Sequence, residues 1–99
     1  MDDSRSAKIS AINLAQKDIH DAYVDALSRN RKTKNSNIKA IENDRDARLK
    51  TATTRQERKS IRKDAREAKS TARQNRRDER KRLRGAKKEK INELKSKLN

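Results

Sequence analysis

The sequence predicts an all-α protein with an N-terminal amphipathic helix, a polar linker and then one very long, highly basic helix. Apolar residues recur at intervals of three and four, which is the period of an α-helix. Good helix formers such as Ala, Lys, Arg, Glu and Gln are abundant, and proline is absent. Only 28% of the residues are hydrophobic and 45% are charged, which leaves too little apolar surface for a large core. We therefore expect a helical hairpin or an extended arrangement, not a compact globule.

Residues 1–27 form the first expected segment, an amphipathic helix that docks on another surface. They hold three basic and five acidic residues, a net charge of −2. Most of their apolar side chains share one helical face, which needs a partner. The simplest partner is the segment 38–52, with a second copy or another protein as the alternatives. The side chains expected to dock are Ile12, Ile19, Tyr23 and Leu27.

Residues 28–37 are the expected linker, with the sequence SRNRKTKNSN. They contain no aliphatic or aromatic side chain and three asparagines. Asn and Ser form local hydrogen bonds that compete with a helix. We therefore expect the first helix to end here and a second one to begin at residue 38.

Residues 38–99 are expected to form the long basic helix. Ile61, Ala72, Leu83 and Leu94 are spaced by eleven residues, a period that keeps an apolar stripe nearly straight. Nothing between residues 37 and 84 resembles a strong helix breaker. Gly85 is the only glycine of the chain, so a kink or a frayed turn is predicted near it.

The basic helix carries the main functional signal. Sixteen of the 33 residues from 58 to 90 are Lys or Arg, and eight like-charged pairs lie four residues apart between 58 and 84. Each such pair destabilises a helix by roughly 0.2–0.5 kcal/mol, and a bound polyanion would relieve the repulsion. We therefore expect a protein that neutralises DNA or RNA through phosphate contacts with little sequence specificity. The expected phosphate contacts are Arg62, Arg66, Arg73, Arg76, Arg77, Arg80, Arg82 and Arg84.

Other functions find less support in the sequence. The sequence gives no basis for expecting an enzyme, a metal site or a cofactor. It has one histidine, His20, no cysteine and no glycine-rich loop. Tyr23 is the only aromatic residue and lies outside the basic region, so base stacking is not expected. No apolar run is long enough to span a membrane.

The alternative hypothesis is a structural or assembly protein, such as a virion scaffold, whose basic face contacts an acidic protein surface. In either case the N-terminus does not resemble a secretion signal, because it begins with acidic residues. The expected location is therefore inside a cell or a particle: cytoplasm, nucleoid or virion interior.

Overall fold

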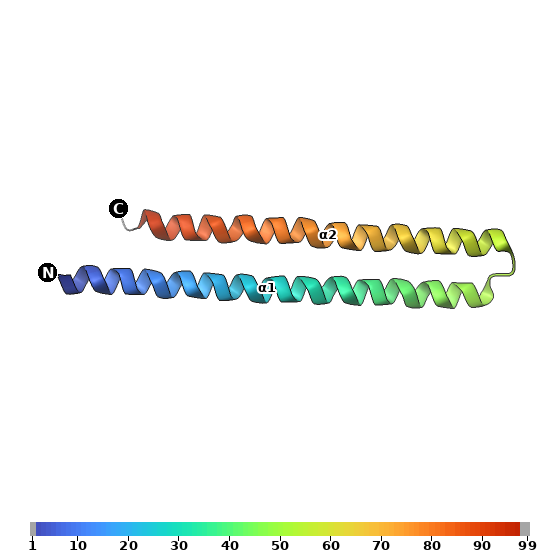
Figure 1. Ribbon diagram of the computed structural model, residues 1–99, viewed down its shortest axis with the longest axis horizontal. Helices are drawn as coiled ribbons and strands as arrows, with labels where there is room; N and C mark the ends of the chain where they lie inside the picture. Colours follow the sequence, from blue (N-terminus) through green and yellow to red (C-terminus); the bar gives the residue numbers. More distant parts are fainter. Residues whose placement is uncertain (1, 98–99) are drawn as a thin grey trace. The chain divides into compact units, whose positions relative to one another are not determined.

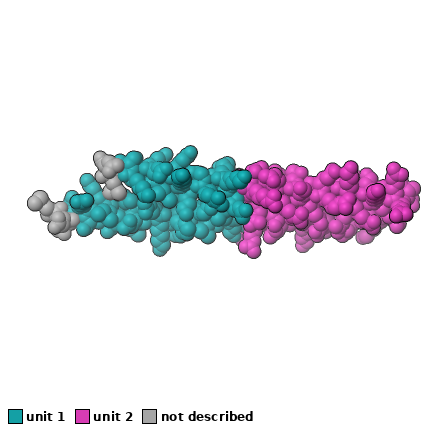
Figure 2. Space-filling view, turned by 45° about the horizontal axis from the view of Figure 1, so that its top comes forward, with its two compact units in different colours: residues 1–28, 80–99 teal, residues 29–79 magenta. Residues whose placement is uncertain are grey.

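The computed structural model describes residues 2–97, which form two helices, α1 (Asp2–Thr51) and α2 (Arg55–Ser96) (Figure 1). No strand occurs among these residues, so the all-α prediction is confirmed. The chain divides into two compact units: unit 1 consists of residues 1–28 and 80–99, and unit 2 of residues 29–79 (Figure 2). Each unit thus combines a part of α1 with a part of α2.

The predicted linker at residues 28–37 is wrong, because α1 continues through it without interruption. The segment has no glycine or proline, and polar residues alone do not end a helix that has a partner to pack on. Asn30 Nδ2 donates a hydrogen bond to the backbone oxygen of Arg76 at 3.1 Å, and the side chains of Lys34 and Ile38 are half-buried. The asparagine that was expected to favour a break instead ties α1 to α2.

The helical break lies instead at residues 52–54, where the long second helix was predicted to continue. Thr51, Thr53 and Thr54 are β-branched and lower the helix propensity of this stretch. The Thr54 hydroxyl accepts a hydrogen bond from the Glu57 N–H at 3.1 Å, and the Glu57 carboxylate accepts one from the Thr53 N–H at 3.0 Å. This arrangement resembles a capping box, so the sequence Thr-Arg-Gln-Glu specifies the start of α2.

The position of the break changes which segments pack together. Residues 4–27 and 38–51 belong to one helix, so the predicted packing of the first segment on the second is wrong. In unit 2 the contacts join Asn30 to Arg76, Glu42 to Lys69 and Arg48 to Asp64. The residue number falls along α2 as it rises along α1, so unit 2 is an antiparallel helical hairpin.

The buried positions follow an eleven-residue spacing in both helices. Positions 19, 30 and 41 of α1 and position 52 just after its end are all buried or half-buried, and so are positions 12, 23, 34 and 45 of α1. In α2 the positions 61, 72, 83 and 94 behave in the same way. This period keeps the contact seam on one side of a straight helix, whereas a seven-residue period would require supercoiling. The repeat passes directly through the predicted linker at residues 30 and 34.

The buried side chains are few, and three of the four are alanines. Among the described residues they are Ala52, Ile61, Ala65 and Ala72, all of which belong to unit 2. Alanine lets two helices approach closely, so Ala65 and Ala72 lie where α2 packs on α1 in unit 2. In unit 1 the predicted docking residues are half-buried, and the α2 segment 80–96 lies beside them (Figure 1).

At the C-terminal end, α2 continues through Gly85 to Ser96 without interruption. The glycine has no positive φ, and a β-carbon at this position would have no atom within 4 Å. Gly85 is therefore a tolerated helical residue and not a helix end. The last two residues of the predicted basic helix, 98 and 99, lie outside the described part of the chain.

Candidate nucleic-acid interface

The charges on the α2 segment of unit 2, residues 55–79, are sorted by sign onto separate sides of the helix. At 100° per residue, all ten basic residues of this segment fall within an arc of about 140°. We call this surface the basic face. It consists of Arg55, Arg58, Lys59, Arg62, Lys63, Arg66, Lys69, Arg73, Arg76 and Arg77.

The acidic residues of the same segment occupy the opposite side. Their arc spans about 120° and contains no basic residue. Several of these carboxylates have partners: Asp64 Oδ2 lies 3.7 Å from Arg48 Nη2, Asp78 Oδ1 accepts a hydrogen bond from Gln74 at 2.9 Å, and Glu57 accepts the hydrogen bond that caps α2. We call this surface the acidic face. It consists of Glu57, Asp64, Glu67, Asp78 and Glu79.

The sorting of charges follows the same eleven-residue spacing as the buried seam. Arg55, Arg66 and Arg77 form one row of the basic face, and Glu67 and Asp78 form a row of the acidic face. Like-charged pairs four residues apart indicate local repulsion, but they do not show that basic and acidic residues lie on opposite sides of the helix. Placing the charges on a helical projection finds it directly, so the signal was present in the sequence.

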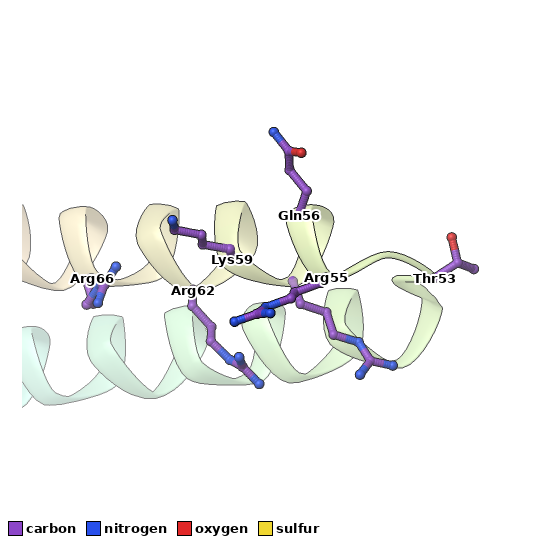
Figure 3. Close-up of a pocket in the computed structure, with 7 residues that line it drawn as sticks. Thr53, Arg55, Gln56, Lys59, Arg62 and Arg66 are labelled. Atoms are coloured by element: carbon purple, nitrogen blue, oxygen red, sulfur yellow. The ribbon is translucent and has the colours of Figure 1, made fainter.

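A shallow depression of about 1060 Å³ lies on the basic face near the first turns of α2 (Figure 3). Arg62 and Arg66, both predicted, line it from successive turns of the helix. Its other lining residues are Thr53, Arg55, Gln56, Arg58 and Lys59, which were not predicted. Five of these seven side chains are basic. They lie at the N-terminal end of α2, where the helix dipole adds further positive potential.

Two residues of the basic face, Lys69 and Arg76, are partly buried and make contacts within unit 2. Lys69 Nζ lies 3.0 Å from Glu42 Oε1, and its side chain is only 18% exposed. The hydrogen bond and the charge of Lys69 lower the pKa of the Glu42 carboxyl below its usual value. Arg76 is half-buried, and its backbone oxygen accepts the bond from Asn30. The remaining eight basic side chains are exposed.

The eight predicted phosphate contacts are divided between the two units. Arg62, Arg66, Arg73 and Arg77 are exposed on the basic face of unit 2, and Arg76 is half-buried on the same face. The other three, Arg80, Arg82 and Arg84, are exposed residues of unit 1. The structure therefore brings five of the eight together on one face of one unit.

The single aromatic residue of the chain is part of a contact within unit 1. Lys87 Nζ lies 4.7 Å from the centre of the Tyr23 ring and 3.0 Å from His20 Nδ1. Tyr23 and His20 are 6.4 Å apart between ring centres. The basic face of unit 2 therefore has no aromatic side chain of its own on which a base could stack.

Comparison of the chain with protein-family descriptions, with characterised proteins and with solved structures finds no match. Among residues 2–97, no three potential metal-ligating side chains gather into a cluster. None of the described helices contains a stretch that is both long and apolar enough to cross a membrane. The arrangement of charge is therefore the feature of the molecule that points to a function.

Proposed function

We propose that this protein binds and neutralises nucleic acid through phosphate contacts, with little sequence specificity. The observation that supports the proposal is the separation of charges on residues 55–79, where ten cations and five carboxylates occupy different sides of one helix. A polyanion beside the basic face relieves the repulsion among neighbouring cations and releases its own counterions. If the same charges were distributed evenly around the helix, carboxylates would lie between the cations and no continuous basic surface would form.

The composition of the basic face favours contacts to phosphates over contacts to bases. Arg and Lys supply only hydrogen-bond donors, which suits phosphate oxygens. Specific recognition of bases would require a defined set of side chains held in a groove, and stacking would require aromatics. Contacts to the backbone position a protein on nucleic acid without reporting its sequence.

The size and charge of the chain suit an accessory role in a larger particle. A net charge of +15 on 99 residues can offset many phosphates of a packaged or condensed nucleic acid. A virion, a nucleoid or a ribonucleoprotein particle would each provide such a partner. The protein would act there as a stoichiometric component that neutralises phosphate charge.

The test is the salt dependence of binding to a duplex of random sequence. Eight exposed cations predict a slope of about −7 for log K against log salt concentration. Replacing Arg62, Arg66, Arg73 and Arg77 with Gln should reduce that slope by about half. Affinity that does not fall between low and moderate salt would contradict the proposal. Tighter binding to polyglutamate than to DNA at equal charge would favour the alternative of an acidic protein partner.

A further inference from the structure

We infer that the basic face of unit 2 takes a double-stranded nucleic acid that lies lengthwise along α2, in preference to a single strand or a compact phosphate ligand. This inference rests on the proposed function and specifies the form and orientation of its ligand. Three features of the described residues carry it: the length of the basic face, the straightness of its rows and its lack of aromatic side chains.

The basic face is long compared with a small anion. From Arg55 to Arg77 the helix rises roughly 33 Å, which matches about ten base pairs of a duplex. The row Arg55, Arg66 and Arg77 repeats every eleven residues and therefore runs nearly parallel to the helix axis. A nucleotide or a short polyphosphate can meet only one end of this row. A stiff polyanion can meet the whole row at once.

The charge density of the ligand favours a duplex over a single strand. A duplex carries one phosphate charge per roughly 1.7 Å, and each contact gives a salt slope of about −0.9, against about −0.7 for a single strand. For eight exposed cations, the duplex gains about 1.6 more logarithmic units of affinity for each tenfold reduction in salt. Proteins that prefer single strands usually offset this difference by stacking bases on aromatics. In this chain the only aromatic, Tyr23, lies in unit 1 with Lys87 over its ring.

The inference is tested by a variant that moves charge between the two faces without changing composition. Two exchanges of neighbours, Arg66→Glu with Glu67→Arg and Arg77→Asp with Asp78→Arg, place two carboxylates on the basic face and two cations on the acidic face. The matched control, Glu67→Ala with Ala68→Glu, moves a carboxylate by one position and leaves it on the acidic side. Both variants keep the net charge of +15. Circular dichroism establishes whether each variant remains helical.

Binding is measured by fluorescence anisotropy with a ten-base-pair G·C-rich duplex, with one of its strands, and with inorganic tripolyphosphate as competitor. We expect the parent protein to bind the duplex at least tenfold more tightly than the strand. The exchanged variant should lose about a hundredfold of duplex affinity and, with two of eight exposed cations removed from the face, about a quarter of the salt slope, while the control behaves as the parent. Tripolyphosphate should compete only weakly at equal charge.

Each outcome distinguishes the inference from the proposed function. Equal affinity of the exchanged variant and the parent for the duplex would overturn the inference, because net charge alone would then suffice. Equal affinity of the parent for duplex and strand, or strong competition by tripolyphosphate, would also overturn it and leave the proposed function standing. Absence of binding to every probe by the parent would reject both. If the exchanged variant does not fold, the affinities of the parent protein for the three probes still test the inference.

Discussion

The two units are built from the same two helices but differ in how they bury apolar surface. Unit 2 has a seam in which Ile61, Ala65 and Ala72 are buried, each with an exposed fraction of 7–9%. Unit 1 contains most of the larger aliphatic side chains, yet none of its described residues is buried to this extent. Ile9, Leu14 and Val24 of unit 1 remain 45–65% exposed. Unit 1 therefore leaves more of its aliphatic surface uncovered than unit 2 does.

The units also differ in how their own segments match in charge. In unit 1 the segment 1–28 has a net charge of −2 and the segment 80–99 has +7, so the two attract. In unit 2 the segments 29–51 and 55–79 each have a net charge of +5, so they repel. The two segments of unit 1 attract each other, whereas an external anion would stabilise unit 2 by reducing the repulsion between its segments. This contrast supports the proposal that unit 2 carries the binding face.

The largest expected effect concerns the aliphatic seam of unit 1. Ile19→Asp should lower the free energy of unfolding by about 2 kcal/mol, because a half-buried aliphatic side chain is replaced by a charge. Hydrogen exchange followed by mass spectrometry should show faster exchange in residues 4–28 and 80–96. Residues 29–79 and their affinity for a duplex should remain close to those of the parent.

The control for this variant is Asn13→Asp, which introduces the same negative charge at an exposed position of the same helix. It should change stability by no more than a few tenths of a kcal/mol. Faster exchange throughout both units in the Ile19 variant would show that the units unfold together. Loss of duplex binding by that variant would show that seam and basic face are not separable.

The second effect concerns the small side chains of unit 2. Ala65→Leu should destabilise the protein by about 1–2 kcal/mol, because Ala65 is only 7% exposed and its neighbours must shift to accommodate the larger side chain. The matched control, Ala47→Leu, makes the same change on the exposed side of α1 and should be nearly neutral. Urea denaturation monitored at 222 nm gives both values. A stabilised Ala65 variant would mean that the helices of unit 2 are not closely packed.

Helix formation and the eleven-residue period were predictable because both depend on local composition and spacing. The helix boundaries were not predicted correctly, because propensity was given more weight than the repeat. Asn30 looked like part of a linker, yet it lies eleven residues after Ile19 and eleven before Ile41. The cap at Thr54 and Glu57 was visible as a sequence motif and was missed.

The basic region and its two faces are visible in the sequence once the charges are placed on a helical projection, but the division of its residues between the two units required the structure. A count of like-charged neighbours finds Arg62 and Arg66 without showing that Arg55 and Lys59 belong to the same face. Whether Arg80 falls in the same unit as Arg77 depends on where α1 ends. The break at residues 52–54 fixes the pairing of α1 with α2 and hence the composition of each unit.

A smaller effect is expected at Gly85 in unit 1. Gly85→Ala should raise the free energy of unfolding by about 1 kcal/mol, because alanine is a better helix former and its β-carbon meets no atom within 4 Å. Thermal denaturation of parent and variant measures the difference. Hydrogen exchange should slow mainly in residues 80–96, the α2 segment of unit 1. A loss of stability would indicate that the helix bends at this residue in a way that alanine does not permit.

The smallest expected effect is a pH dependence that originates in unit 2. Lys69 lowers the pKa of the Glu42 carboxyl, so the unfolded chain binds a proton at this site more readily than the folded one. The resulting stabilisation is fully present above the usual pKa of 4.5 and disappears as the pH falls through the lower, folded value. Glu42→Gln should therefore be less stable than the parent at pH 7 and equally stable in strong acid. Glu89→Gln removes the same charge from an exposed site in unit 1 and serves as the control. A constant difference between the Glu42 variant and the parent at all pH values would mean that the 3.0 Å contact with Lys69 does not contribute through its charge.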